Sequence, residues 1–242
     1  MPTLIEMRLK ATWTVRPDTR FLHGLACALF EVEGVPHTGQ HKPFAVWPLR
    51  PLPGGGPGEW AWRASWLPDG PVPATVAAAD VVRAGHVTCV VTESTQRRVT
   101  HARLADGPGL SDATVRFESP TYFSQNGTDV VLPDPRLIAG SWRRRWNASL
   151  PPEDPLAITD EEWAQTHPAL ILAEYDLCTE RWDTGHGRDR RGFTGQAALR
   201  LARDAPPRVG KVFGTLARFA EFSGTGAQTT CGFGATSVQG LA

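Results

Sequence analysis

The chain has 242 residues, enough for two compact domains of about 120 residues each. Its 25 basic and 25 acidic residues balance, so no overall charge draws the protein to nucleic acid or to an anionic membrane. Apolar residues make up 41% of the chain, which supplies a core and excludes a wholly disordered protein. The sequence has no apolar run of about 18 residues and no signal peptide, so we expect a cytoplasmic protein without a membrane span.

The first half predicts alternating strands and helices. Polar and apolar residues alternate over 4–15, which indicates a strand. Asp18 or Thr19 can begin a helix that ends at Gly34. The elements expected next are strands over 44–49 and 60–66, a helix over 74–84 and a strand over 86–93. The resulting order, β-α-β-β-α-β, is that of a ferredoxin-like fold.

The second half repeats this order. Short strands at 115–117 and 121–123 are expected to flank a Ser-Pro turn, and a helix should run from Asp134 or Pro135 to Asn147. After an acidic, proline-rich surface connection at 150–162, the expected elements are strands over 169–183 and 192–201, a helix over 209–221 and a strand over 235–239. We therefore predict an α+β protein with two tandem ferredoxin-like (βαββαβ) domains, 1–113 and 114–242.

The four cysteines do not indicate a metal site or a disulfide framework. Cys27, Cys89, Cys178 and Cys231 are widely separated and form no C-x-x-C pair. We expect all four to be buried as small apolar side chains. The sequence also lacks a compact group of carboxylates for a two-metal nuclease, so we expect no metal and no cofactor.

A glycine-rich segment closes the chain. Residues 222–234 read FSGTGAQTTCGFG. The segment lacks the lysine of a phosphate-binding P-loop, and it follows a helix and precedes a strand, which excludes a dinucleotide fingerprint. Its glycines either end the helix and allow a tight turn, or they hold a phosphate with backbone N–H groups.

This ending resembles the C-terminal signature of the CRISPR-associated endoribonucleases that process precursor CRISPR RNA, the Cas6 family of the RAMP superfamily. There an amphipathic helix leads into Gly-x-Gly-x-x-Thr-x-x-Gly-x-Gly, and the matching positions here are Gly224, Gly226, Thr229, Gly232 and Gly234. Residues 118–147 and 22–44 are similar to two other parts of that family. The resemblance implies tandem ferredoxin-like domains and an RNA-contacting role for the four glycines.

Candidate catalytic residues come from the first half. Cutting RNA without a metal requires a base for the attacking 2′-hydroxyl, an acid for the leaving 5′-oxygen and a cation for the phosphorane. His37, His41 and Lys42 lie in one polar stretch, and the resemblance implies catalytic roles for His37 and Lys42. His23, on the predicted first helix, faces either the site or the core and is the third candidate. Some relatives carry a catalytic tyrosine where this chain has Cys27.

Basic residues are concentrated locally although the chain is neutral. Residues 186–211 hold seven of them against two aspartates: Arg188, Arg190, Arg191, Arg200, Arg203, Arg208 and Lys211. We predict RNA contacts from Arg188, Arg190, Arg191 and Lys211, with phosphates and 2′-hydroxyls rather than bases in a stem. Arg143 and Arg144 are further candidates, although with Arg145 they point in different directions on a helix and a solvated face is the alternative.

Taken together, the resemblance and the residues predict a metal-independent endoribonuclease. It would cleave CRISPR repeat RNA in the precursor transcript by 2′-hydroxyl attack and retain the mature CRISPR RNA. The alternative is a catalytically silent subunit that binds repeat RNA within an RNA-guided surveillance complex. A small-molecule enzyme on the same fold finds no supporting motif. The expected partners are a stem-loop repeat RNA and other CRISPR-associated subunits.

Overall fold

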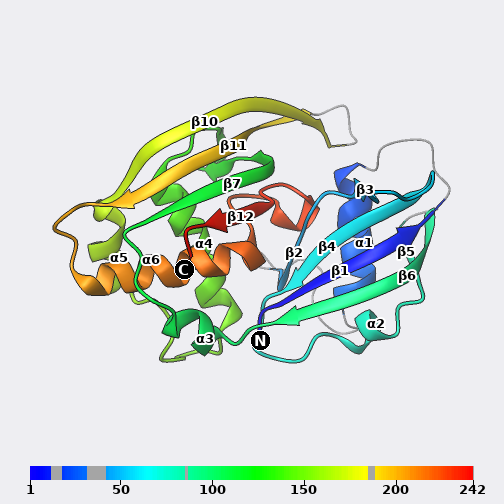
Figure 1. Cartoon of the computed structure of the whole chain (residues 1–242), viewed down its shortest axis with the longest axis horizontal. Coiled ribbons are helices and arrows are strands. Elements are labelled where there is room, and N and C mark those ends of the chain that lie inside the picture. Colours follow the sequence, from blue (N-terminus) through cyan, green and yellow to red (C-terminus); the bar gives the residue numbers. More distant parts are fainter. Residues whose placement is uncertain (12–17, 32–41, 85–86, 185–188, 242) are drawn as a thin grey trace.

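The computed structural model describes residues 1–11, 18–31, 42–84, 87–184 and 189–241. Figure 1 shows the two large β-sheets next to each other, one built by each half of the chain, with helices on one face of each, and two short strands of the second half form a small separate sheet. The first half contains β1 (Thr3–Lys10), α1 (Thr19–Phe30), β2 (Phe44–Val46), β3 (Arg50–Pro51), β4 (Glu59–Trp66), α2 (Ala74–Ala77), β5 (Val81–Ala84) and β6 (Val87–Arg98).

The first sheet has the strand order β2-β4-β1-β6-β5, and β3 also pairs with β4. All of its pairs are antiparallel. Asp18 begins α1 by accepting a hydrogen bond from the backbone N–H of Phe21 at 2.8 Å. The buried side of α1, which includes Leu22, Leu25 and Leu29, packs on the apolar face of this sheet. The order β2-β4-β1-β6 is that of a ferredoxin-like fold, and β5 adds an edge strand.

The second half repeats this arrangement with longer elements. Its elements are α3 (His101–Asp106), β7 (Asp112–Thr121), β8 (Phe123–Gln125), β9 (Thr128–Val130), α4 (Pro135–Ser149), α5 (Asp160–Thr166), η1 (His167–Ala169), β10 (Leu170–Asp183), β11 (Asp189–Leu201), α6 (Pro207–Ser223), η2 (Thr229–Cys231) and β12 (Thr236–Gln239). The sheet order β10-β11-β7-β12 is again ferredoxin-like. The predicted α+β class with tandem ferredoxin-like domains is confirmed, while the boundary at 113/114, which falls just inside β7, stays a prediction.

Two crossover helices and their aromatic side chains form the core of the second half. Trp142 and Trp146 on α4 and Phe213 and Phe219 on α6 are fully buried in one cluster. The Trp146 and Phe219 rings meet edge to face with centroids 5.2 Å apart. The helix predicted over 209–221 is thus confirmed as α6.

The helix predicted over 74–84 is wrong. Only Ala74–Ala77 is helical, and the chain then forms strand β5. Val82 and Ala84 are buried whereas Val81 and Arg83 are exposed, so burial alternates as in a strand. Pairing with β6 therefore decides the conformation of a stretch whose alanines favour a helix.

The turn predicted at Ser119-Pro120 is also wrong, because β7 runs through it. On the neighbouring strand, Phe193 pairs with Thr121 and Gly195 with Phe117, so the extra β7 residues bulge out of the ladder. The bulge accommodates a proline, which has no N–H to donate, and the Pro120 carbonyl accepts a hydrogen bond from Gly234.

Two smaller predictions need correction as well. The connection predicted over 150–162 already contains the start of α5, which Thr159 and Glu162 cap reciprocally. Cys89 is buried and Cys27 and Cys231 are half-buried, but Cys178 is exposed. Cys178 lies on β10, an edge strand whose residues are almost all exposed, so its side chain finds no core to enter.

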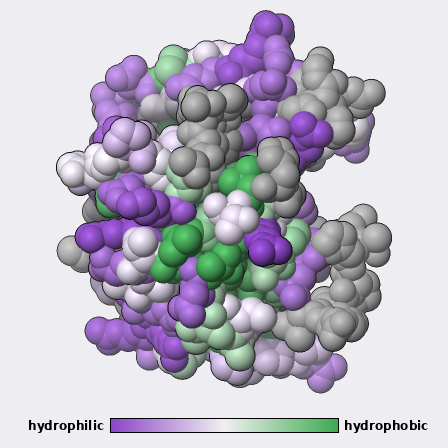
Figure 2. Space-filling model, turned by 90° about the vertical axis from the view of Figure 1, so that its right-hand side faces the viewer, coloured by the Kyte–Doolittle hydropathy of each residue, from purple (hydrophilic) through white to green (hydrophobic). Residues whose placement is uncertain are grey.

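The surface at the end formed by the first half is partly apolar. Figure 2 looks at this end and shows apolar residues gathered in the middle of the face, with hydrophilic residues around them. Val81 and Val90, which pair across β5 and β6, are exposed to 50% and 47%. In the parts of the chain that the structure describes, no helix is long and apolar enough to cross a membrane.

Candidate active site

A cleft of about 750 Å³ lies between α1 and the second half of the chain. Its lining comes from α1, from β9, from the facing ends of β10 and β11, and from the glycine-rich segment. These lining residues are Thr19, Arg20, His23, Gly24, Cys27, Asp129, Thr184, Asp189, Arg190, Gln228 and Cys231. Figure 1 shows the hairpin of β10 and β11 extending from the second half toward the first. The cleft thus combines groups that the sequence separates by about 200 positions.

His23 is held from both sides of its ring. Its Nδ1 lies 3.1 Å from the carbonyl oxygen of Thr230, and its Nε2 lies 3.5 Å from Cys27 Sγ, one turn along α1. Because a carbonyl oxygen can only accept, the proton of the neutral imidazole sits on Nδ1. Nε2 is therefore the nitrogen that can take up and release a proton.

Cys27, one turn along α1 from His23, is the residue that the resemblance sets against a tyrosine of some relatives. Burial raises the pKa of its thiol to about 12, helped by a hydrogen bond to Glu31 and by the negative charge of that carboxylate. The thiol consequently stays protonated at neutral pH. With its proton donated to Glu31, it supplies neither a thiolate nor the phenol of a tyrosine.

Lys42 lies at the same end of α1 as Cys27. Its Nζ is 2.5 Å from Glu31 Oε1, and the two side chains are only 14% and 19% exposed. The Glu31 backbone N–H donates to the Cys27 carbonyl, which fixes the helix end. His23, Cys27 and Glu31 follow one another at four-residue spacing, so Lys42, which is paired with Glu31, lies on the same side of α1 as His23, although it does not line the cleft. His37 and His41 lie outside the described residues.

The four glycines of the C-terminal segment all have positive φ, between 65° and 90°. A Cβ on Gly226 would overlap the carbonyl oxygen of Tyr122, and one on Gly234 would overlap that of Thr225. A Cβ on Gly232 would lie 2.6 Å from Leu22 Cδ1 on α1. The glycines thus allow close approach within the protein, including the approach of the segment to the first helix.

Several backbone N–H groups of this segment are already used inside the protein. Thr225 donates to the Gly234 carbonyl at 2.8 Å, Gly226 to Ser141 Oγ at 3.0 Å, and Ala227 to the Tyr122 carbonyl at 2.9 Å. These groups do not point to a phosphate. RNA contact by Gly224, Gly226, Gly232 and Gly234 stays a prediction, whereas their part in shaping the cleft is visible.

Arg190 brings positive charge to the cleft. Its guanidinium pairs with Asp129 on β9 and lies over the Tyr122 ring, 5.5 Å from the centroid. The hydrogen bond to Asp129 raises the pKa of Arg190 above its ordinary value. Arg191, the next residue, is exposed. Arg188 lies outside the described residues.

The predicted basic stretch 186–211 does not form one surface. Strand β11 has 13 residues, which at about 3.3 Å each puts roughly 40 Å between its ends. Lys211 lies on α6 and donates to the carbonyls of Asp106 and Gly107 at 3.1 and 2.9 Å, so it caps α3. Arg208 pairs with Glu162. Lys211 therefore lies apart from the cleft, contrary to the cluster expected from sequence.

The three arginines of α4 point in different directions, as helix geometry predicts. Arg143 donates to the Ile158 carbonyl and pairs with Asp160 at 2.6 Å, so its guanidinium is already bonded within the protein. An RNA contact from Arg143 stays a prediction. Arg144 is exposed. Arg145 was not a candidate, yet its Nη2 donates to the Phe44 carbonyl at 2.9 Å and joins the halves. Burial lowers the pKa of Arg145 to about 10.

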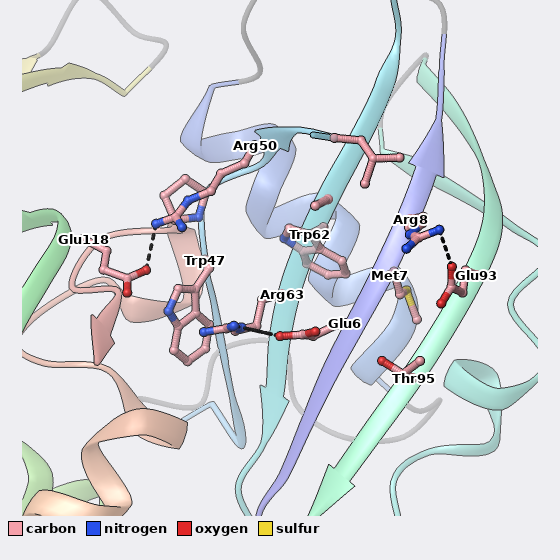
Figure 3. A pocket seen from close by; sticks show the side chains of 13 residues that line it. Glu6, Met7, Arg8, Trp47, Arg50, Trp62, Arg63, Glu93, Thr95 and Glu118 are labelled. Carbon is pink, nitrogen blue, oxygen red and sulfur yellow. Dashed lines mark hydrogen bonds and ion pairs between the residues drawn. The ribbon is translucent and has the colours of Figure 1, made fainter. Parts of the chain in front are cut away.

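A second hollow, of about 310 Å³, lies over the open face of the first sheet. Figure 3 shows three arginines in it, each paired with a glutamate. Arg8 pairs with Glu93, Arg63 with Glu6 and Arg50 with Glu118, all at 2.7 Å. Its charges are paired, as that of Arg190 is in the cleft, so the difference between the two sites is the histidine, which the described lining of this hollow lacks. The cleft at His23 is the better candidate for proton-transfer chemistry.

Within the described residues, no group of three or more His, Cys, Asp or Glu side chains is placed to hold a metal ion. The chain is thus an α+β protein of two ferredoxin-like domains, with a cleft between them that His23 lines. The family model described as "CRISPR-associated endoribonuclease Cas6" matches residues 115–236, half of the chain. The chain belongs to this family.

Curated relatives match part of the chain in sequence. The CRISPR-associated endoribonucleases Cas6 of two Mycobacterium tuberculosis strains are 31% identical over 145 residues, which is 60% of this chain and 43% of each relative. The matched region thus spans less than half the length of these relatives.

Solved structures match over nearly the whole chain. The Cas6 (TTHB231) product complex, whose protein is from Thermus thermophilus, is 29% identical with a TM-score of 0.81, covering 98% of this chain and 100% of the other. The Cas6 (TTHA0078) product complex is 27% identical with a TM-score of 0.79, covering 98% and 99%. A Cas6-related protein from Pyrococcus furiosus, 13% identical with a TM-score of 0.58 and covering 99% of both chains, shares the fold.

Proposed function

We propose that this chain is a metal-independent endoribonuclease that cleaves CRISPR repeat RNA in the precursor transcript and keeps the mature product bound. Membership of the Cas6 endoribonuclease family supports the reaction class. The observation that carries the proposal is the cleft between the two halves, which is lined both by a histidine whose Nδ1 lies against the Thr230 carbonyl and by Arg190. Two similar structures were solved as product complexes, which supports retention of the product.

The proposed step is an attack of the RNA on itself. The 2′-hydroxyl oxygen bonds to the adjacent phosphorus, the bond from phosphorus to the 5′-oxygen breaks, and no water is consumed. A base removes the 2′-hydroxyl proton and an acid protonates the leaving 5′-oxygen. His23 Nε2 and His37 supply these two functions, and Lys42 stabilises the charge on the phosphorane. The fragments end in a 2′,3′-cyclic phosphate and a 5′-hydroxyl.

Binding of the repeat stem is proposed to rest on arginine contacts to the phosphates at the hairpin end. Arg190 lines the cleft, and Arg191 follows it on an exposed position of β11. Arg188 belongs to the same basic run. Arg144, exposed on α4 near Trp163 of α5, is proposed as a separate phosphate contact away from the hairpin end. A stem-loop RNA presents phosphates and 2′-hydroxyls rather than base edges, which suits guanidinium groups.

The test is cleavage of a labelled repeat RNA by purified protein in excess EDTA. We expect one cut, a cyclic phosphate on the upstream fragment, and no cut when a single 2′-deoxy nucleotide stands just before the scissile phosphate. Cleavage of that 2′-deoxy substrate would exclude the proposed mechanism. Activity that requires added divalent metal would exclude metal independence.

A silent RNA-binding subunit of an RNA-guided surveillance complex is the second candidate. The structural observations that favour it are the protonated thiol of Cys27 and the ion pair that holds Lys42 on Glu31. The same assay separates the candidates, because the silent subunit would bind the repeat RNA tightly and leave it intact.

A further inference from the structure

Gln228 has a left-handed backbone conformation with positive φ, which elsewhere in the glycine-rich segment only glycines adopt. Gly224, Gly226, Gly232 and Gly234 have positive φ, and Gln228 joins them with φ 53° and ψ 33°. An L residue with a Cβ is sterically disfavoured in this left-handed region, which glycine adopts freely. The turn alone would therefore be served better by a fifth glycine, so the side chain of Gln228 needs its own explanation.

Gln228 is part of the cleft wall. It is exposed, and it lines the cleft together with His23 and Arg190. Its amide makes no hydrogen bond to any of the residues that the structure describes. The Gln228 carbonyl accepts from the Cys231 N–H at 2.9 Å, which begins the short helix η2 and places Thr230 against His23. Gln228 is thus built into the same turn that orients the histidine.

We propose that Gln228 is a specificity-determining residue, whose amide reads the edge of an unpaired nucleobase next to the scissile phosphate. This inference rests on the proposed endoribonuclease function. A carboxamide offers one acceptor and two donors in a plane, which matches the edge of a base and discriminates between bases. It is the only carboxamide among the cleft's described lining residues, whereas Arg190 supplies charge for phosphates.

Two substitutions separate the side chain from the turn. Gln228→Gly removes the amide and relieves the backbone, so the variant should be at least as stable to heat as the wild type. Gln228→Asn tolerates the left-handed region and keeps a shorter amide. The matched control is Asn126→Gly, because Asn126 also carries an amide at positive φ (50°) but lies in the β8–β9 turn and does not line the cleft.

The experiment measures single-turnover cleavage and binding of a panel of repeat RNAs, each changed at one base flanking the cut. The wild type and Asn126→Gly should prefer one base at one position by about tenfold or more. Gln228→Gly should lose this preference and keep the wild-type response at every other position, and Gln228→Asn should lie between. An unchanged preference, or an equal loss of rate on all substrates, would overturn the inference.

Cleavage tests the proposed endoribonuclease function, and binding tests the role of Gln228 independently of cleavage. If the wild type cleaves none of these RNAs, the endoribonuclease proposal fails, and the binding measurements on the same panel still decide Gln228. A preference in wild-type affinity that Gln228→Gly abolishes would then support the reading of a base. Equal base preferences in both proteins would overturn it.

Discussion

His23 on α1 and Thr230 in the glycine-rich segment meet across the cleft, with Nδ1 of the histidine 3.1 Å from the threonine carbonyl oxygen, although 207 positions separate them in the chain. The second half of the protein thereby decides which nitrogen of a first-half histidine exchanges protons. Gly232, two residues further on, permits the same approach, since a Cβ there would lie 2.6 Å from Leu22 Cδ1. The glycine-rich segment is therefore part of the histidine's environment.

The first prediction concerns the two histidines. His37→Ala and His23→Ala should each lower the single-turnover cleavage rate by about 10²–10⁴, because proton transfer acts in the transition state. Affinity for the repeat RNA should hardly change, since binding is shared over many phosphate contacts. His167→Ala, on η1 and outside the cleft, is the control. If His37→Ala cleaves at the wild-type rate, His23 becomes the better candidate for proton transfer. If His23→Ala cleaves at the wild-type rate, His23 does not transfer a proton in the reaction.

The second prediction concerns Lys42. Lys42→Ala should lose less rate than His37→Ala, because neighbouring arginines partly replace its charge and Glu31 already neutralises much of it. The rates of both variants, measured at saturating protein on the same repeat RNA, give the comparison. A larger loss from Lys42→Ala than from His37→Ala would contradict this ranking and would show that no other cation replaces the Lys42 ammonium at the phosphorane.

The third prediction concerns Asp129, which competes with RNA for Arg190. Asp129→Asn should free the guanidinium and tighten repeat binding by up to about fivefold, which is the range of an exposed ion pair. Arg190→Ala should weaken binding and lower the slope of log K against log salt by about one. Both are read from binding titrations at several salt concentrations.

Asp204→Asn is the charge-matched control for Asp129→Asn, because Asp204 is exposed in the turn after β11 and does not line the cleft. Equal tightening by both aspartate variants would show a general charge effect. An unchanged slope for Arg190→Ala would show that Arg190 holds no phosphate.

The fourth prediction separates strain from collision at two glycines. Gly127 (φ 76°) has open space where a Cβ would be, so Gly127→Ala should cost about 1 kcal/mol of unfolding free energy from the backbone alone. Gly226 (φ 81°) has the Tyr122 carbonyl oxygen at that point, so Gly226→Ala should cost at least about 1 kcal/mol more. Urea unfolding of both variants measures the difference, and equal costs would mean that the Tyr122 backbone moves freely.

The fifth prediction concerns acid sensitivity at the junction of the halves. His101 is buried, with its ring 2.9 Å from Ser149 Oγ and 3.3 Å from Asp69 Oδ1. Burial lowers the pKa of His101 below its ordinary 6.5, although Asp69 opposes this shift. Below pH 6.5 the unfolded chain therefore binds more protons at this position than the folded chain, and stability falls as the pH falls.

The slope from this one group is at most about 1.4 kcal/mol per pH unit. The pKa of Asp69 is lowered by the N-terminal ammonium group and by His101, so its contribution is lost only at more acidic pH. The difference between the unfolding free energies at pH 7.5 and pH 5.5 should be smaller in His101→Gln than in the wild type. His167→Gln is the control. Equal pH dependence in wild type and His101→Gln would contradict the assignment.

Local periodicity explains which elements could be predicted. The alternation over 4–15 and the helical spacing over 209–221 are both properties of short stretches. Strand β1 forms over the first part of the former, Thr3–Lys10, residues 12–17 lie outside the described residues, and α6 forms over the latter. The alanine-rich stretch over 74–84 favours a helix locally, but pairing with β6 overrides it. At Pro120 the sequence favours a turn, whereas the bulge that absorbs the proline depends on β11 and on the glycine-rich segment.

The sequence by itself determined the two ferredoxin-like repeats, the family resemblance and the candidacy of His23 and Lys42, because these follow from spacing and residue type along the chain. Only the tertiary structure decided that Thr230 fixes the tautomer of His23, that Arg190 is held by Asp129, and that Arg145 joins the halves. It also separated Lys211 from the cleft. The physical reason is that each of these facts is a contact between residues far apart in sequence, and tertiary packing within the second half or between the two halves, rather than any local pattern, brings them together.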